Sequence, residues 1–226
     1  MTKFSRAFWV ANFVELLERL AYYAVFISLV MYLSSIWGFS DIEAGIIAGT
    51  FSALLYFLPT FLGAYSDKIG FRKAIMAAFA LLTVGYFGLG LVPTLLESAG
   101  LVKYGAANAV MDDSIFQSFF KSIGVGEFDR STAFSGLRES AQQWTIVPIL
   151  LFIVVGGAFI KSVISAKETT ADTRARGFAI FYMMVNIGAF TGKTVVDPLR
   201  KSIGDQGLVY LNYFSATMTF IALIVV

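Results

Sequence analysis

Long apolar segments dominate this sequence, and each is long enough to cross a lipid bilayer as an α-helix. Such a helix needs about 20 predominantly apolar residues, and six segments provide them: residues 8–37, 44–65, 74–95, 144–166, 177–196 and 207–226. Hydrophobic residues make up 58% of the 226 and charged residues only 14%, which excludes an ordinary soluble domain. We therefore expect an all-α integral membrane protein built as a bundle of six transmembrane helices.

The apolar segments fall into two groups of three, separated by a polar stretch. Residues 1–96 would hold transmembrane helices 1–3, residues 97–143 an extracytoplasmic insertion, and residues 144–226 transmembrane helices 4–6. In the insertion, apolar residues at helical spacing after Asp112 and Asp113 predict an amphipathic helix, which could pack on the bundle, lie at the membrane interface, bind a partner or gate an entrance. The chain stops inside an apolar run at Val226, so we expect a longer membrane protein to continue beyond it.

Basic residues in the connections predict the orientation of the chain. Cytoplasmic loops carry the excess of Lys and Arg in membrane proteins. The N-terminus and the connections after the second and fourth segments would share one side, and they hold Lys3, Arg6, Lys68, Arg72, Lys73, Lys167, Arg174 and Arg176. The short connections opposite hold only Arg200 and Lys201. We expect a multi-pass protein of the cell (inner) membrane with a cytoplasmic N-terminus.

The composition excludes several classes of function. The sequence contains no Cys and no His, so thiolate or imidazole metal sites and Ser-His or zinc hydrolases lack their residues. The expected spans also lack an Asp pair, so we do not expect an enzyme. A net charge of +2 without a Lys/Arg run argues against a nucleic-acid partner. Proton chemistry would have to use carboxylates, Lys, Arg or Tyr.

Charged residues inside the expected spans are candidate functional groups. Each costs at least about 2.5 to 3.5 kcal/mol on insertion scales, and Glu15, Glu18, Arg19 and Lys161 stand out. On a helix, the first three share an arc of about 100° with Tyr22. Two carboxylates beside one Arg leave a net negative group that can take up and release a proton. The alternative is a static ion-pair network that fixes helix packing.

Lys161 and one further Lys, Lys193, lie in the expected spans. Lys161, near the cytoplasmic end of the fourth span, is at a depth similar to that of the Glu residues, and it could pair with one of them, bind a ligand carboxylate or snorkel to the interface. Lys193 follows Asn186 by one heptad and precedes Asp197 by four residues. For Lys193 the spacing favours an i,i+4 ion pair with Asp197.

Two sequence runs resemble signatures of one family. The run from Glu15 to Tyr23, ELLERLAYY, resembles the ExxERFxYY signature of the proton-dependent oligopeptide transporters, a branch of the major facilitator superfamily, with Leu20 at the Phe position. In the fifth span, the run from Phe178 to Gly188, FAIFYMMVNIG, resembles the second signature of that family, FxxFYxxINxG.

Two looser matches lie between these signatures. The run from Gly63 to Lys73, GAYSDKIGFRK, resembles the GxxxDRxGRR loop of the superfamily, with Phe71 at its first basic position after the second Gly. The segment GGAFIKS, which ends at Ser162, is similar to the part of the fourth helix where the family has Lys followed by Pro-Asn. The matches occur in the family's order along the chain.

The resemblance implies roles for the matched residues. It implies a proton-coupling cluster of Glu15, Glu18, Arg19 and Lys161, of which Arg19 and Lys161 would also bind the substrate carboxylate. It implies a central cavity lined by Tyr22, Tyr23, Tyr56 and Asn186, and a cytoplasmic gate formed by Asp67 and Arg72. The chain would be the N-terminal half of a transporter whose second six-helix half rocks against it in alternating access.

The resemblance therefore implies a symporter that imports di- and tripeptides with protons, embedded in membrane lipid and driven by a proton gradient without a cofactor. The ExxER run argues for proton coupling but does not identify the cargo. A permease of the same fold for another small solute, such as nitrate or an organic anion, is an alternative. A membrane receptor or structural protein without transport activity is a second alternative.

Overall fold

The computed structural model describes residues 4–100, 143, 145–163, 174–204 and 206–226, without the side chains of residues 71, 161–163, 174 and 200. The amphipathic helix that the sequence predicts after Asp112 lies outside these residues. All regular secondary structure within them is helical: α1 (Arg6–Phe26), α2 (Leu29–Ser35), α3 (Asp41–Phe57), α4 (Pro59–Ile69), α5 (Phe71–Ser98), α8 (Ile146–Val163), α9 (Arg174–Ile203) and α10 (Gln206–Val225).

Three of the described helices are long and apolar enough to cross a membrane, or five if each of two bent helix pairs is one span. The single helices are α5, α9 and α10, and the bent pairs are α1–α2 and α3–α4. The fully described part of α8, Ile146–Ile160, is apolar but shorter than the other candidates. The chain is therefore a membrane protein with three to five candidate spans among the described residues, whereas the sequence predicted six.

Both bends have local causes in the sequence. The first pair bends by 45° where the hydroxyl of Ser28 donates to the carbonyls of Ala24 and Val25, each at 3.1 Å. Such bonds compete with the helical ladder. The second pair bends by 46° at Pro59, which has no N–H to donate and whose ring clashes with the preceding turn.

The run from Gly63 to Lys73, expected as a loop, is mostly helical. Helix α4 continues to Ile69, and α5 begins at Phe71. Gly70 alone makes the turn, with a φ of 88°, in the region that favours glycine because a Cβ would clash there. Asp67 and Arg72 are exposed on either side of this turn.

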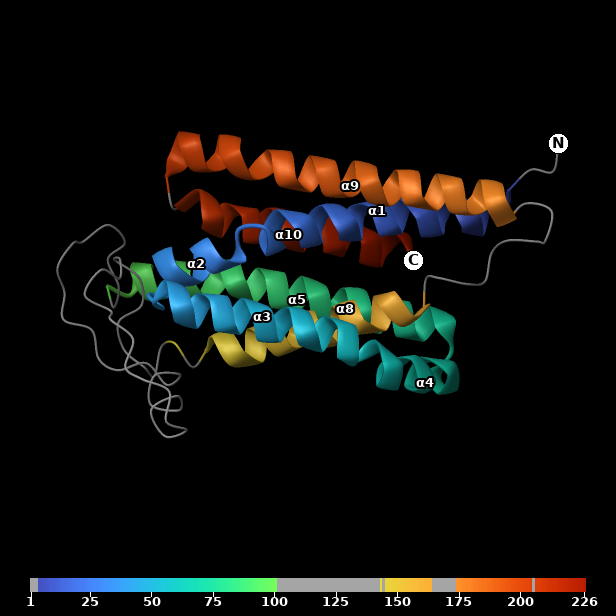
Figure 1. Ribbon diagram of the computed structural model, residues 1–226, viewed down its shortest axis with the longest axis horizontal. Helices are drawn as coiled ribbons and strands as arrows, with labels where there is room; N and C mark the ends of the chain where they lie inside the picture. The colour runs from blue at the N-terminus through green and yellow to red at the C-terminus, as the bar shows by residue number, and fades with distance from the viewer. Residues whose placement is uncertain (1–3, 101–142, 144, 164–173, 205) are drawn as a thin grey trace.

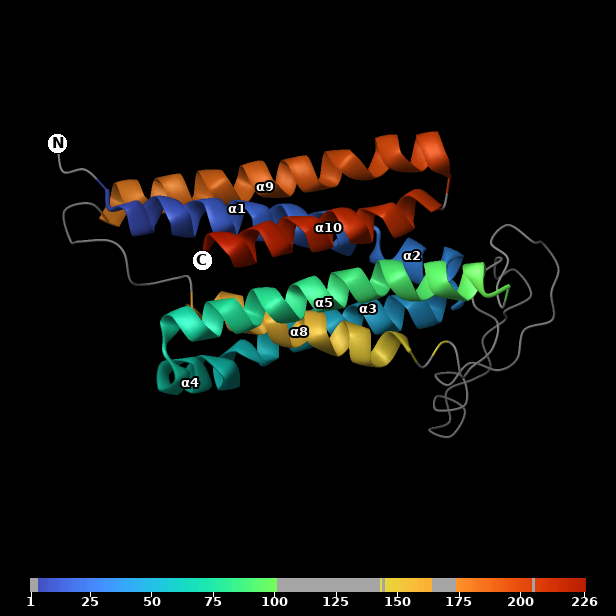
Figure 2. The same ribbon diagram turned by 180° about the vertical axis from the view of Figure 1, so that it is seen from behind.

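The helices run alternately in opposite directions along one bundle (Figures 1 and 2). The pair α1–α2 and helices α5 and α9 run one way, and α3–α4, α8 and α10 run the other way. Helix α1 packs against α9 and α10, while α5 packs against α10 and α8. Helices α3 and α4 pack against α8, and α2 packs against α3. Helix α10 thus joins the α1–α9 pair to the rest of the bundle.

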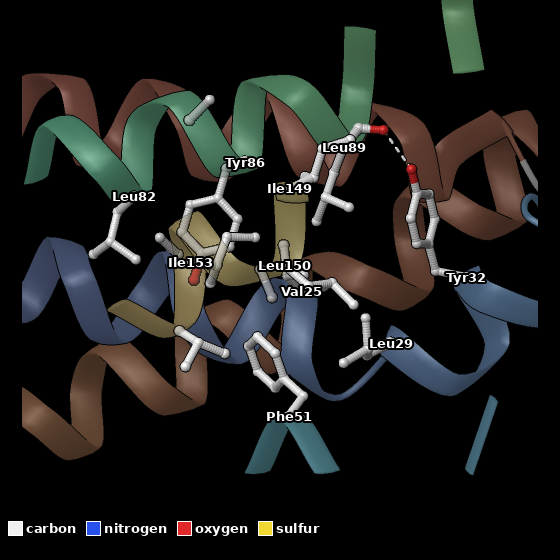
Figure 3. Packing of buried hydrophobic residues seen from close by; sticks show 14 of the residues in the cluster. Val25, Leu29, Tyr32, Phe51, Leu82, Tyr86, Leu89, Ile149, Leu150 and Ile153 are labelled. Atoms are coloured by element: carbon white, nitrogen blue, oxygen red, sulfur yellow. Dashed lines mark hydrogen bonds between the residues drawn. The ribbon is translucent and has the colours of Figure 1, made fainter. Parts of the chain in front are cut away.

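Buried apolar side chains from α1, α2, α3, α5 and α8 pack together inside the bundle (Figure 3). The Tyr32 hydroxyl of α2 donates to the Leu89 carbonyl of α5, which satisfies a polar group in the apolar interior. Glycines bring α5 and α8 close together: a Cβ at Gly156 would lie 2.9 Å from the Ala78 carbonyl oxygen. This contact fixes the helix that carries Lys161.

The start of α3 shows how sequence sets one helix end. Ser40 and Glu43 form a capping box, in which the Glu43 carboxylate accepts from the Ser40 N–H at 2.9 Å and the Glu43 N–H donates to the Ser40 hydroxyl. The Glu43 side chain is buried in this role. A carboxylate in an apolar chain therefore has a structural use here.

Candidate functional site

Helix α1 carries a buried cluster of charges composed of Glu15, Glu18 and Arg19. The Arg19 Nε lies 3.0 Å from a Glu15 carboxylate oxygen and 2.5 Å from a Glu18 oxygen. The side chains are only 6%, 3% and 12% exposed, in the order Glu15, Glu18 and Arg19. Helical geometry explains this arrangement, because residues four apart lie on one face and Glu18 adjoins Arg19 in the sequence.

The cluster has an unequal charge count. With both carboxylates ionised, one guanidinium faces two negative charges, so the group carries a net charge of −1. A proton on either carboxylate makes the group neutral and leaves Arg19 with one charged partner. The three residues can therefore exchange a proton and, at the same time, change how tightly Arg19 is held.

Helix α9 packs directly onto the backbone of α1 beside this cluster. A Cβ at Gly188 would lie 2.7 Å from the Leu16 carbonyl oxygen and 2.9 Å from the Arg19 Cβ. A Cβ at Gly192 would lie 2.5 Å from the Leu20 carbonyl oxygen. The two glycines are four residues apart, the small-residue spacing that allows close helix approach in membranes. This spacing is visible in the sequence and was the available signal for the contact.

Aromatic rings continue the site beyond the charges. The Arg19 guanidinium carbon lies 5.5 Å from the Tyr22 ring centroid, within cation–π range. The Tyr22 ring stacks on Phe26, with centroids 5.1 Å apart, and meets Tyr23 edge-on at 5.3 Å. Both tyrosines are half-buried. They offer phenol groups next to the cluster, on the side toward α2.

Lys193 of α9 extends over the second tyrosine. Its Nζ lies 5.1 Å from the Tyr23 ring centroid. The sequence spacing favoured an ion pair with Asp197, and the structure places the ammonium over the ring instead. The close packing at Gly192 explains this position, since it brings the next residue of α9 up to α1.

Three other residues predicted to bind substrate, Tyr56, Lys161 and Asn186, lie on three different helices. Tyr56, on α3, is 76% exposed, and its phenol is close enough to that of Tyr22 for an electrostatic interaction. Asn186 is exposed on α9. Lys161 lies in α8, but its side chain is outside the described residues. The structure thus brings Glu15, Glu18, Arg19, Tyr22 and Tyr23 together on α1 and leaves the Lys161 contacts open.

The structure adds Tyr86, which the sequence analysis did not single out. This side chain of α5 is only 2% exposed, and it interacts electrostatically with Glu18. Figure 3 shows its hydroxyl pointing from α5 toward α1. The rings of Tyr86 and Tyr22 line one narrow cavity. A tyrosine in the middle of an apolar span was the available signal, because its hydroxyl needs a polar partner.

Comparison with known proteins finds dipeptide and tripeptide permeases among the relatives of this chain. No protein-family model matches the chain. It is 32% identical over 142 residues to dipeptide and tripeptide permease B of Photorhabdus asymbiotica, a match that covers 54% of this chain and 29% of the permease. It is 32% identical over 114 residues to dipeptide and tripeptide permease A of Salmonella typhi, covering 50% of this chain and 22% of the permease.

A third relative, dipeptide and tripeptide permease B of Shigella dysenteriae, is 30% identical over 142 residues. The chain thus matches less than a third of the length of these curated relatives. Proteins named as permeases are transporters, and the chain is similar to them over about half its length.

Proposed function

We propose that this chain belongs to a proton-coupled symporter of the oligopeptide transporter family, which imports di- and tripeptides. The observation that carries the proposal is the buried cluster in which Arg19 lies against both Glu15 and Glu18. The similarity to dipeptide and tripeptide permeases supports a peptide cargo. The cluster supports the coupling to protons, since its charge changes when one carboxylate is protonated.

The proton step follows from the geometry of the cluster. In the unprotonated state, two carboxylates hold the Arg19 guanidinium. A proton on one carboxylate removes one of these attractions, and the guanidinium then becomes available to the C-terminal carboxylate of a peptide. Arginine suits this role because its planar fork matches a carboxylate. Proton and peptide would therefore bind together and leave together.

Peptide binding would use groups around Arg19. Lys161 would share the C-terminal carboxylate with Arg19 and take part in proton coupling. The phenols of Tyr22, Tyr23 and Tyr56 and the amide of Asn186 would bind the peptide backbone, for which they supply both donors and acceptors. Tyr56 and Asn186 are exposed, as residues that face a second half of the transporter would be.

Transport would proceed by alternating access within the major facilitator fold. The described helices would form the N-terminal six-helix half, with α8 as the fourth span. Residues 1–96 would supply transmembrane helices 1–3 and residues 144–226 helices 4–6, with residues 97–143 between them as an extracytoplasmic insertion. A second half would rock against it around the site. Asp67 and Arg72, beside the turn at Gly70, would form part of a cytoplasmic gate. The N-terminus would lie in the cytoplasm, and the protein in the inner membrane.

Uptake by the full-length protein in liposomes tests the proposal. We expect dialanine uptake that rises with an inward proton gradient, and we expect Glu18→Gln and Lys161→Ala to abolish the gradient-driven part. Glu97→Gln is the matched control, because Glu97 is an exposed carboxylate at the end of α5, and this variant should transport like the wild type. Folded wild-type protein without dialanine uptake would contradict a peptide cargo. Gradient-driven uptake that survives in Glu18→Gln would contradict the role of the cluster.

A further inference from the structure

Lys193 is a cation at the middle depth of the bundle. Its neighbour Gly192 packs on Leu20 and Ala24 of α1, and at the same level the Ser215 hydroxyl donates to the Ala21 carbonyl at 3.0 Å. Ser215 is central in α10, which runs from Gln206 to Val225. Helix α9 continues for ten residues beyond Lys193, about 15 Å at the α-helical rise. Lys193 is therefore far from either end of its helix.

The partners of this ammonium differ from those of Arg19. Two carboxylates contact Arg19, whereas none of the described carboxylates lies within 4.0 Å of the Lys193 Nζ. The Lys193 Nζ instead lies over the face of the Tyr23 ring. A cation within a span is costly and is by default a functional group, and a ring face satisfies it less well than a charged hydrogen bond does.

We propose that Lys193 is a second binding group for a ligand carboxylate, held over Tyr23 until the ligand arrives. This inference rests on the proposed peptide transport. A carboxylate that enters the site would replace a cation–π contact by a charged hydrogen bond, so the exchange favours binding. Lys193 itself is exposed, so a ligand can reach it without breaking an ion pair among the described residues.

The spacing of the two cations indicates which ligands benefit. Tyr23 lies four residues beyond Arg19 on α1, about 6 Å along the helix axis. An extended peptide covers that distance with about two residues, at roughly 3.3 to 3.6 Å each. A peptide whose terminal carboxylate binds Arg19 can therefore present an acidic side chain to Lys193. The same ammonium could instead take the terminal carboxylate itself, so the two sources must be separated by experiment.

Competition against labelled dialanine uptake by the full-length protein in liposomes separates these sources. The competitors are Ala-Glu and its neutral isostere Ala-Gln, together with unlabelled dialanine and its C-terminal amide. In Lys193→Gln we expect Ala-Glu to compete at least about tenfold less well, the minimum effect of a lost charged hydrogen bond, with Ala-Gln unchanged. Loss of affinity for dialanine but not for its amide would also support the proposal, with the terminal carboxylate as the ligand.

Three controls make the test specific. Lys193→Arg should keep most of the preference for Ala-Glu, because the charge remains. Lys201→Gln removes another exposed lysine of the same helix and should leave all four competitors unchanged. The melting temperature of Lys193→Gln should match that of the wild type, which excludes a folding defect as the cause.

Two outcomes overturn different claims. If wild-type protein takes up dialanine and Lys193→Gln binds all four competitors like the wild type, Lys193 is not a carboxylate-binding group and the proposed transport stands. An equal loss for every competitor, the dialanine amide included, also overturns the inference, since it would show a general role in packing. If the wild type takes up no dialanine, the proposed function fails and this inference fails with it.

Discussion

Replacing Gly192 by Ala should separate α9 from the helix that carries the charge cluster. The added Cβ would lie 2.5 Å from the Leu20 carbonyl oxygen and 3.1 Å from the Ala24 nitrogen. Ordinary contacts begin at 3.4 Å, so the first pair must separate by about 0.9 Å. Both neighbours are backbone atoms in the last two turns of α1, which ends at Phe26, and the helical hydrogen bonds prevent them from turning away. The relief must therefore come from a movement of α9 as a whole.

The expected loss in the free energy of unfolding is about 1 to 3 kcal/mol, the usual range for an overpacked interior. The matched control is Gly49→Ala: Gly49 lies in the interior of α3 with open space around its Cβ position. This control should gain about 0.5 to 1 kcal/mol from better helix propensity.

Thermal melting of the purified full-length protein in detergent measures both variants. The Gly192→Ala protein should melt below the wild type and the Gly49→Ala protein at or above it. We also expect Gly192→Ala to lower dialanine uptake, because Lys193 and the Tyr23 ring lie at the same contact. Equal melting temperatures for the two variants would refute the close packing of α9 on α1, and with it the placement of Lys193.

Three further predictions concern single contacts. Glu43→Ala should lower stability by about 1 kcal/mol through loss of the capping box with Ser40, and an unchanged melting temperature would contradict that role. Gly70→Ala should cost about 1 to 3 kcal/mol, because an L residue is strained at a φ of 88° and a ψ of 146°; denaturation of the purified variant would check this. Tyr86→Phe keeps the buried ring but removes the hydroxyl that interacts electrostatically with Glu18, so gradient-driven uptake should fall at an unchanged melting temperature. Wild-type uptake by this variant would place the hydroxyl outside the proton step.

Helix content and the charge cluster were predictable because local spacing determines both. Apolar segments of sufficient length predict helices wherever they occur, and the positions of Glu15, Glu18 and Arg19 on one helix fix their common face. The bend at Pro59 was also readable from the sequence, since proline interrupts a helix. The bend at Ser28 was not, because a serine can donate to its own helix without breaking it.

Contacts between helices could not be predicted from spacing along a single helix. The spacing of Lys193 and Asp197 places both residues on one face of α9, but it does not show that the Tyr23 ring of the neighbouring helix contacts Lys193. Tyr86 likewise gains its meaning only from the fold, in which this residue of α5 interacts electrostatically with Glu18 of α1. Similarly, the Gly188 and Gly192 pair predicts close packing but does not identify α1 as the partner.

The packing of α9 on α1 holds the base of the Arg19 side chain in place, and the guanidinium extends beyond this contact. The Arg19 Cβ packs closely against Gly188, because a Cβ added to that glycine would lie only 2.9 Å from it. The guanidinium lies farther out, between two carboxylates and above the Tyr22 ring. Protonation of one carboxylate therefore cannot shift α1 past α9 without breaking backbone contacts at the glycines. The response with the lowest cost is a rotation of the Arg19 side chain from a carboxylate toward the tyrosines, where a peptide would bind. Under the proposed function, the proton and the peptide would be coupled by a single side chain, and α1 and α9 would move as one body.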